Sequence, residues 1–519
     1  MRPLGEVCWN FGVTREAGVA VAGALGGRSP RGVLGWFAVG AMGASGLVTV
    51  LIGLLGPSAV VPGLPGPSWH PPYSWQVAPS GHLVVAMAAA AIVLGTVGLG
   101  AALVADRRGD LPGARWFLGV GSAVVALLAF LPPSGSPDHL NYAAYGRMVT
   151  LGLDPYATSA NDLPHDPVAG AVEEWRGTTS VYGPMATAVQ ALAGAVGGES
   201  VRLTVFVLAL VNAAAFIGTS LLIHRLTGGD RRATLLWAAN PLLVYHLAAG
   251  MHTDTLAIMC VVAATAAGAY GTARPAEVPA GRHVASGMLL GLGIGVKVNV
   301  GIAALGPAWE LRRRPGRLAV VAGSAVLTVA ALYALAGRHA LDQVQAASRQ
   351  VSLATPWQLV KRALQAVFGP GAYTAWIQVG SLLLLVLLAW LLLKAMTRAA
   401  GELYAAQVSA AVVIAWLLAA PYALPWYDGL AFAFLALMPA LAVTPVLSGF
   451  LVARLGLLSL AYLPARQAGQ PADLSWLVEV VRKQVVPALL LALTVAMVWW
   501  AWRAGARART RPASAAPPR

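Results

Sequence analysis

The chain has 519 residues, of which 58% are hydrophobic and only 11% are charged. A soluble domain carries about 25% charged residues, so this composition excludes a water-soluble fold and indicates a polytopic α-helical membrane protein. The net charge of +15 comes from short basic clusters between apolar segments. Because no nucleic-acid-binding motif accompanies them, we interpret these clusters as markers of membrane topology and predict no nucleic-acid partner.

The first helix is predicted at residues 33–55, since a membrane crossing needs roughly 20 apolar residues. Residues 1–32 are basic and are predicted to be a cytoplasmic segment, and the first helix lacks the cleavage site of a signal peptide. Residues 32–105 contain no Lys or Arg. Basic residues concentrate on the cytoplasmic side, so the loop after the first helix is predicted to be outside, with a return helix at 83–105.

A helix at residues 116–131 leads to a long predicted outer loop, residues 132–183. Only one full crossing, residues 201–222, fits between this loop and the next basic cluster. The apolar stretch 184–196 is therefore predicted to be interfacial or re-entrant, because a further crossing would reverse the sidedness of everything that follows.

Residues 284–309 have basic residues at both ends and carry Lys297 and Asn299 in the middle. Glycines at 291, 293 and 295 would allow a helix to break there. We predict two short helices that form a hairpin, with Lys297 near the turn.

The rest of the chain continues the pattern of apolar segments. Further helices are predicted at about residues 237–249, 255–270, 318–335, 376–393, 403–420, 428–444, 447–463 and 484–502. A second outer loop is predicted at 338–375 and a basic, disordered cytoplasmic tail at 503–519. The prediction is thus one all-α transmembrane domain, residues 33–502, with about fourteen helical segments and both termini in the cytoplasm. No clear internal repeat is present, which argues against common transporter folds.

The first outer loop concentrates acidic, aromatic and Arg side chains. The acids are Asp138, Asp154, Asp162, Asp166, Glu173 and Glu174, and the interleaved residues are Tyr142, Tyr145, Arg147, Tyr156, Trp175, Arg176 and Tyr182. Connectors are usually short. Carboxylates accept hydrogen bonds from sugar hydroxyls, and aromatic faces stack on sugar rings. This loop therefore predicts a carbohydrate site on the outer face.

Asp138 follows a Pro-rich helix exit, which places a carboxylate at the membrane interface. Asp138, Tyr142 and Tyr145 have the i, i+4, i+7 spacing of one helical face. At this depth a lipid-linked phosphate and a hydroxyl from the aqueous side can meet. The alternative is that Asp138 is only the N-cap of that helix.

A second polar cluster, residues 250–254, contains His252 and Asp254 next to an apolar helix. Polar groups this close to lipid are candidates for function, although Thr253 or Asp254 capping the helix is the alternative. No complete set of metal ligands is visible here. The two cysteines, Cys8 and Cys260, lack metal-ligand spacing.

Lys297 in an apolar stretch needs a counter-charge, and a phosphate would supply one. Snorkelling to the interface is the alternative. Rival phosphate ligands are Arg147, Arg349, Lys361 and Arg362. Aromatic residues recur on the outer side at Trp357, Trp426 and Tyr427, either as a substrate groove or as an ordinary interfacial belt.

Three segments of the first outer loop carry a family resemblance: Asp138 with Tyr142–Arg147, Gly152–Tyr156 and Ser180–Pro184. This pattern resembles the bacterial polyprenol-phosphomannose-dependent α-1,6-mannosyltransferases, which are integral-membrane glycosyltransferases of the GT-C class. Residues 250–254 and 425–427 are similar to further motifs of that family, except that Thr253 stands where relatives often have Asn. The resemblance runs from about residue 33 to 502.

The resemblance implies a GT-C fold and an inverting transfer of mannose from polyprenyl-phosphate-mannose. The implied acceptor is an α-1,6-mannan chain on a phosphatidylinositol-mannoside anchor, in lipomannan and lipoarabinomannan synthesis. Asp138 is the implied base, and no cofactor or metal is required. The predicted location is the bacterial plasma membrane, with the active site facing outward.

Residues of both outer loops and the intramembrane polar positions are expected to bind substrate. These are Tyr142, Tyr145, Arg147, Asp154, Tyr156, Tyr182, His252, Asp254, Lys297, Trp357, Trp426 and Tyr427. The competing interpretations are a flippase or transporter of lipid-linked sugars, or another GT-C enzyme such as an arabinofuranosyltransferase or a protein O-mannosyltransferase.

Overall fold

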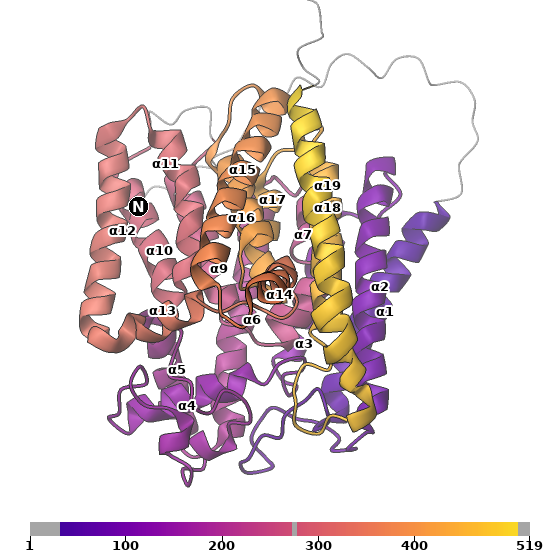
Figure 1. Ribbon diagram of the computed structural model, residues 1–519, viewed down its shortest axis with the longest axis vertical. Coiled ribbons are helices and arrows are strands. Elements are labelled where there is room, and N and C mark those ends of the chain that lie inside the picture. The colour runs from indigo at the N-terminus through magenta and orange to yellow at the C-terminus, as the bar shows by residue number, and fades with distance from the viewer. Residues whose placement is uncertain (1–31, 272–277, 507–519) are drawn as a thin grey trace, which may run out of the picture.

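The computed structural model describes residues 32–271 and 278–506, and these residues are helical with no β-strand beyond one isolated bridge. The predicted all-α fold is therefore confirmed for the described part of the chain. Most of the predicted N-terminal segment 1–32, with Cys8, and most of the tail 503–519 lie outside it. Figure 1 shows long helices running roughly along one axis, with α4 (Asp138–Thr150), α5 (Pro184–Gly197) and several loops gathered at one end.

Seven stretches of the described residues are long and apolar enough to cross a membrane. They are α1 (Val33–Leu55), α2 (Gly81–Arg108), α6 (Val201–Leu226), α12 (Pro315–Ala336), α15 (Thr374–Ala400), α18 (Thr444–Ala461) and the stretch Ala472–Ala506, which comprises η8 (Ala472–Ser475), η9 (Leu477–Val485) and α19 (Val486–Ala506). Three apolar helices are shorter: α3 (Ala114–Leu128), α9 (Asp254–Gly268) and α16 (Ala405–Ala419). These helices support a membrane protein, whereas the count of about fourteen segments stays a prediction.

The remaining helices have fewer than 18 residues each. They are η1 (Ala160–Asp162), η2 (Ala169–Ala171), α7 (Arg231–Leu236), α8 (Pro241–Leu243), η3 (Val244–Ala249), α10 (Ala280–Val296), η5 (Val298–Ala304), α11 (Leu305–Leu311), η6 (Arg338–Leu341), α13 (Asp342–Ser348), α14 (Pro356–Phe368), η7 (Pro425–Tyr427) and α17 (Asp428–Leu437).

Two predicted helices differ from the structure at prolines. The one expected at 237–249 is broken before Pro241, because proline has no N–H to donate. The helix starts again at Pro241, and the Asn240 side chain caps this start by accepting from the N–H groups of Leu242 and Leu243 at 3.1 and 3.3 Å. The one expected at 428–444 ends at Leu437, just before Pro439.

The hairpin predicted around Lys297 is confirmed. Helix α10 stops at Val296, Lys297 has an extended backbone, and η5 and α11 lead the chain back. The return is visible in one contact: the N–H of Gly271, close to the start of α10, donates to the Glu310 carboxylate in α11 at 2.8 Å. The side chain of Lys297 therefore sits at the inner turn of a short hairpin.

The basic α11–α12 link and the basic ends of α15 and α19 lie together at the end of the bundle opposite α4 (Figure 1). Arg231 donates to the carbonyls of Leu111 and Asp106, which ties α7 to the basic end of α2. The side of the membrane on which these ends lie stays a prediction.

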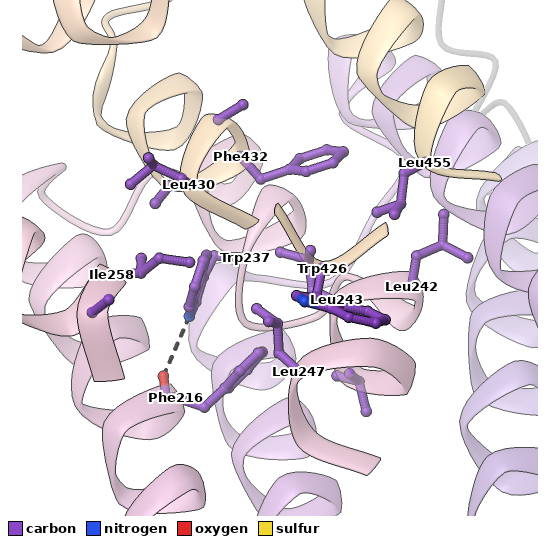
Figure 2. Close-up of a cluster of buried hydrophobic side chains, with 14 of the residues drawn as sticks. Phe216, Trp237, Leu242, Leu243, Leu247, Ile258, Trp426, Leu430, Phe432 and Leu455 are labelled. Carbon is purple, nitrogen blue, oxygen red and sulfur yellow. Dashed lines mark hydrogen bonds between the residues drawn. The ribbon is translucent and has the colours of Figure 1, made fainter. Parts of the chain in front are cut away.

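Large buried side chains fill the centre of the bundle (Figure 2). The Trp237 ring stacks on Phe216 at 5.1 Å between centroids, and its indole N–H donates to the Phe216 carbonyl at 3.3 Å. Trp426 belongs to the same cluster and is 2% exposed. Truncating a buried Trp to Ala costs about 3–5 kcal/mol, so this core fixes the position of η7, which carries Trp426.

Helices α4 and α5 cross with their backbones in contact. A Cβ atom placed on Gly146 would lie 2.0 Å from the carbonyl oxygen of Gln190, and one on Gly194 would meet Gly146 at 2.9 Å. The stretch predicted to be interfacial or re-entrant is thus the 14-residue helix α5, packed on α4 and α6. This close packing fixes α4, whose first residue is Asp138.

Candidate active site

One cavity of about 370 Å³ lies where α4 meets the centre of the bundle. Segments far apart in sequence supply its lining. The lining includes Asp138, Asn141, Tyr142, Tyr145, Trp175, Thr178, Tyr182, Lys297, Asn299, Gln343, Gln350, Trp416, Tyr422, Trp426 and Tyr427. Among the described residues that line it, Asp138 is the only carboxylate and Lys297 the only cation. The size falls within the range of about 300–1,000 Å³ that is usual for small-molecule sites.

Asp138 is the first residue of α4 and not its cap. The N-cap position is Pro137, and no side chain caps this helix, so the capping alternative is wrong. The backbone N–H of Asp138 donates to the Ser136 hydroxyl at 3.2 Å. Its carboxylate is 15% exposed and reaches the cavity.

The environment of Asp138 makes it a stronger base than an ordinary carboxylate. Burial raises its pKa to about 6, and the nearby charge of Lys297 partly offsets that rise. At neutral pH the group is still mainly ionised, so it combines the charged form with a raised proton affinity.

A row of polar rings backs this carboxylate. The Tyr182 hydroxyl donates to the Tyr142 hydroxyl at 3.1 Å, which in turn lies 3.4 Å from Nδ1 of His252. The same nitrogen is 3.6 Å from the Asp138 carboxylate. The imidazole stacks on Trp426 at 3.5 Å between centroids, and its burial lowers the pKa of His252 well below the usual value. A neutral His252 thus stands behind Asp138 and Tyr142.

Lys297 already has a protein counter-charge. Its ammonium donates to both oxygens of Asp254 at 2.8 and 2.7 Å, and it lies 4.3 Å from the ring centre of Tyr427. Thr253, at the N-cap of α9, makes no side-chain cap, so Asp254 serves this ion pair and the capping alternative is wrong. The Lys297 ammonium also lines the cavity. With three N–H donors, it has one left for a ligand.

Six of the predicted substrate-binding residues lie outside the cavity lining. Two of them, His252 and Asp254, lie against Asp138 and Lys297, and the other four contact different parts of the chain. Arg147 pairs with Asp166 at 2.9 Å, and the Asp154 carboxylate accepts the N–H of Tyr156. The Tyr156 hydroxyl lies 2.8 Å from the Thr187 hydroxyl, which ties the loop to α5. The fourth, Trp357, donates its indole N–H to the carbonyl of Ala419 at 2.7 Å. These contacts hold the outer loops in place.

The rival phosphate ligands Arg349, Lys361 and Arg362 are also absent from the described lining of the cavity. Arg362 instead donates to the Lys483 carbonyl, which joins α14 to η9. Of the predicted cations, the structure therefore brings only Lys297 to the carboxylate.

Sequence reasoning missed several lining residues, among them Gln343, Gln350 and Trp416. The Trp416 ring stacks on Tyr427 at 5.8 Å, and Gln343 comes from the short helix α13. Asn299 was noticed only as a polar residue beside Lys297, yet its buried Oδ1 has no partner among the described residues. A buried amide oxygen without a partner is costly and points to a ligand donor.

Comparison with known proteins decides the family. The profile of the family "Alpha-(1->6)-mannopyranosyltransferase, N-terminal domain" matches residues 40–313, just over half of the chain. The chain belongs to this family. The matched range contains Asp138 and Lys297, and about half of the residues that line the cavity come from it.

Curated relatives with the same designation align with shorter segments of the chain. The chain is 31% identical over 140 residues to alpha-(1->6)-mannopyranosyltransferase A of Corynebacterium glutamicum, which is 26% of this chain and 29% of that protein. It is 30% identical over 219 residues to alpha-(1->6)-mannopyranosyltransferase A of Mycobacterium tuberculosis, 40% of either chain. It is 27% identical over 199 residues to alpha-(1->6)-mannopyranosyltransferase B of Corynebacterium glutamicum, 36% of this chain and 33% of that protein.

These alignments span less than half of the length of each of these relatives. No solved structure matches the chain. The family membership therefore rests on sequence, and the site geometry rests on the fold described above.

Proposed function

We propose that this chain is a membrane α-1,6-mannosyltransferase that takes mannose from polyprenyl-phosphate-mannose. The acceptor is an α-1,6-mannan chain of a lipoglycan, lipomannan or lipoarabinomannan, and the reaction takes place on the outer face of the plasma membrane in a GT-C fold. One observation carries the proposal: a single carboxylate, Asp138, and a single cation, Lys297, line the same aromatic cavity among the described residues.

Asp138 acts as the general base. The 6-hydroxyl of the acceptor gives its proton to the Asp138 carboxylate while its oxygen attacks C1 of the donor mannose. The new bond joins O6 to C1, and the bond from C1 to the phosphate oxygen breaks with its electron pair leaving on the polyprenyl phosphate. A β-linked donor then gives an α-linked product by one inversion. The raised pKa of Asp138, about 6, suits this proton transfer near neutral pH.

Lys297 stabilises the leaving phosphate. The charge on the phosphate grows as the bond to C1 breaks, and an ammonium aimed at that site lowers the barrier. The Asp254 carboxylate holds Lys297 with both oxygens at 2.7–2.8 Å. This contact keeps the ammonium in place before the donor arrives, and the remaining N–H is directed to the phosphate. Because phosphate can leave as an anion, this scheme needs no general acid and no metal.

The neutral groups of the cavity orient the sugars. Hydroxyls of Tyr142 and Tyr182 and the amide of Asn299 can exchange hydrogen bonds with mannose hydroxyls. The rings of Trp416 and Tyr427 provide flat apolar surface beside Lys297. We assign the donor sugar to this deeper part of the cavity.

The test is sugar transfer by the purified chain in lipid nanodiscs, given polyprenyl-phosphate-mannose and a short α-1,6-mannoside, with and without EDTA. We expect a product whose new bond maps as α-1,6 and whose yield is unchanged by EDTA. A folded, donor-binding sample that makes no product contradicts the proposal and favours transport of lipid-linked sugars. Loss of product with EDTA, restored by a divalent cation, contradicts the metal-free scheme alone.

A further inference from the structure

Trp175 differs from the other aromatic residues of the cavity in its exposure. Its side chain is 55% exposed although it lines the cavity. Trp426, by contrast, is 2% exposed and is covered on one face by His252. In the described part of the chain no other ring packs against Trp175. Its indole thus offers an open flat face at the mouth of the cavity.

The backbone at Trp175 is held in an unfavourable conformation. Its φ is +59°, a region of backbone conformation that residues with a side chain rarely adopt. Such a conformation persists only where the surroundings enforce it.

Hydrogen bonds fix the loop on both sides of Trp175. The carbonyl of Glu174 accepts from the Asn141 side chain at 3.2 Å, and the carbonyl of Arg176 accepts from the N–H of Asn161 at 3.0 Å. The Trp175 carbonyl itself accepts from the N–H of Thr178 at 2.8 Å.

The acidic residues before Trp175 are tied to a distant segment. Glu173 forms an ion pair with Arg466, and the Glu174 carboxylate accepts the N–H of Gln467. Arg466 also donates to the carbonyl of Val61, in the loop after α1. The loop that carries Trp175 is thus held by α4, by the segment at Arg466 and, through Arg466, by the loop after α1. These contacts keep the indole at the cavity mouth and out of the apolar interior.

We infer that Trp175 forms a subsite for an acceptor sugar, binding the pyranose next to the one that reacts. This inference rests on the proposed function. Asp138 is 15% exposed and lies deep, whereas Trp175 lies at the rim. The acceptor hydroxyl must reach Asp138, so the preceding sugar unit of the chain passes the rim. The apolar face of that pyranose stacks on the indole, and Trp175 selects acceptors longer than one sugar.

The experiment compares Trp175→Ala, Trp175→Phe and wild type in nanodiscs, with methyl α-mannoside and α-1,6-mannotriose as acceptors. Trp69→Ala is the matched control, because Trp69 is 73% exposed and lies outside the cavity lining. Size-exclusion profiles verify folding.

For Trp175→Ala we expect the KM for mannotriose to rise roughly tenfold or more, the scale of losing one aromatic anchor. The KM for the donor, the kcat at saturating acceptor and the kinetics with methyl α-mannoside stay at wild-type values. Trp175→Phe retains most of the preference for mannotriose, and Trp69→Ala behaves like wild type.

An unchanged KM for mannotriose in a folded Trp175→Ala variant overturns the subsite while leaving the proposed function intact. Calorimetric titration of mannotriose without donor tests the subsite independently of the proposed function. Binding by wild type that Trp175→Ala weakens, without any transfer by wild type, supports the subsite and contradicts the proposed function. Absence of mannotriose binding by wild type also overturns the subsite.

Discussion

At the residue scale, the chemistry of the site depends on two charges of opposite sign that share one cavity. Asp138 is the proposed base, and burial raises its pKa to about 6 while Lys297 partly offsets the rise. Lys297 is in turn held by Asp254. The charge of Lys297 therefore acts on Asp138, and this effect can be measured.

The first prediction concerns pH. A base must be deprotonated to act, so transfer should fall as the pH drops through about 6 and be constant above it, because the pKa of Asp138 is raised to about 6. The measurement is kcat/KM for the acceptor from pH 4.5 to 8 in nanodiscs. A rate that stays flat down to pH 4.5 would show that another group is the base.

The second prediction concerns Lys297→Met. Loss of the ammonium should lower kcat by about 10²–10³-fold, the scale of losing one donor to a developing charge. It should also move the acid limb to higher pH, because Lys297 lowers the pKa of Asp138. The paired control is Lys297→Met with Asp254→Asn, which leaves no unpaired buried carboxylate. A double variant that folds but has wild-type kcat would remove Lys297 from the phosphate site.

Several residues of the site were predictable from sequence because their pattern is local. The i, i+4, i+7 spacing placed Asp138, Tyr142 and Tyr145 on one face, and all three line the cavity. The Lys297–Asp254 pair joins residues 43 positions apart. The sequence shows two opposite charges in apolar segments, but only the fold shows that they form an ion pair. Gln343 and Gln350 carry no motif and were found only in three dimensions.

At the scale of elements, the site depends on helix breaks and close crossings more than on long helices. Lys297 reaches the cavity because α10 ends at Val296. The sequence predicted this break from glycines and a charge inside an apolar stretch. It missed the break at Asn240–Pro241, because apolar periodicity continues across the proline.

The third prediction tests the crossing of α4 and α5. In Gly146→Ala the added methyl would lie 2.0 Å from the Gln190 carbonyl, so α4 must move and carry Asp138 with it. We expect transfer to fall at least tenfold, since small misplacement of a catalytic group is costly, together with a lower Tm. The matched control is Gly323→Ala in α12, where a Cβ meets nothing within 4 Å. Equal activity and Tm in the two variants would show that the crossing does not position Asp138.

At the scale of the whole molecule, the basic ends of α15 and α19 lie opposite the α4 loops, and the orientation of the bundle in the membrane stays a prediction. The all-α class followed from composition, because so few charged residues require lipid around the helices. The number of crossings did not follow from composition, because α5, α8 and α11 are apolar helices too short to cross a membrane by themselves.

The fourth prediction concerns orientation. In a Cys8→Ser, Cys260→Ala background, His165→Cys on the first outer loop should react with a membrane-impermeant maleimide in intact cells. Arg313→Cys, at the basic end, should react only after the membrane is opened. Both residues are exposed in the fold, so accessibility to the reagent depends on the side of the membrane. The reverse pattern would place the cavity on the cytoplasmic side.

The measurement that tests the central claim most directly is transfer by Asp138→Asn in nanodiscs, with donor binding measured on the same sample. Asparagine keeps the shape but cannot take the proton, so kcat should fall by about 10²–10⁴-fold while the donor Kd is unchanged. Asp162→Asn, an exposed carboxylate on the same loop, should transfer at the wild-type rate. Near-normal turnover by a folded Asp138→Asn variant would contradict the assignment of this cavity's carboxylate as the base.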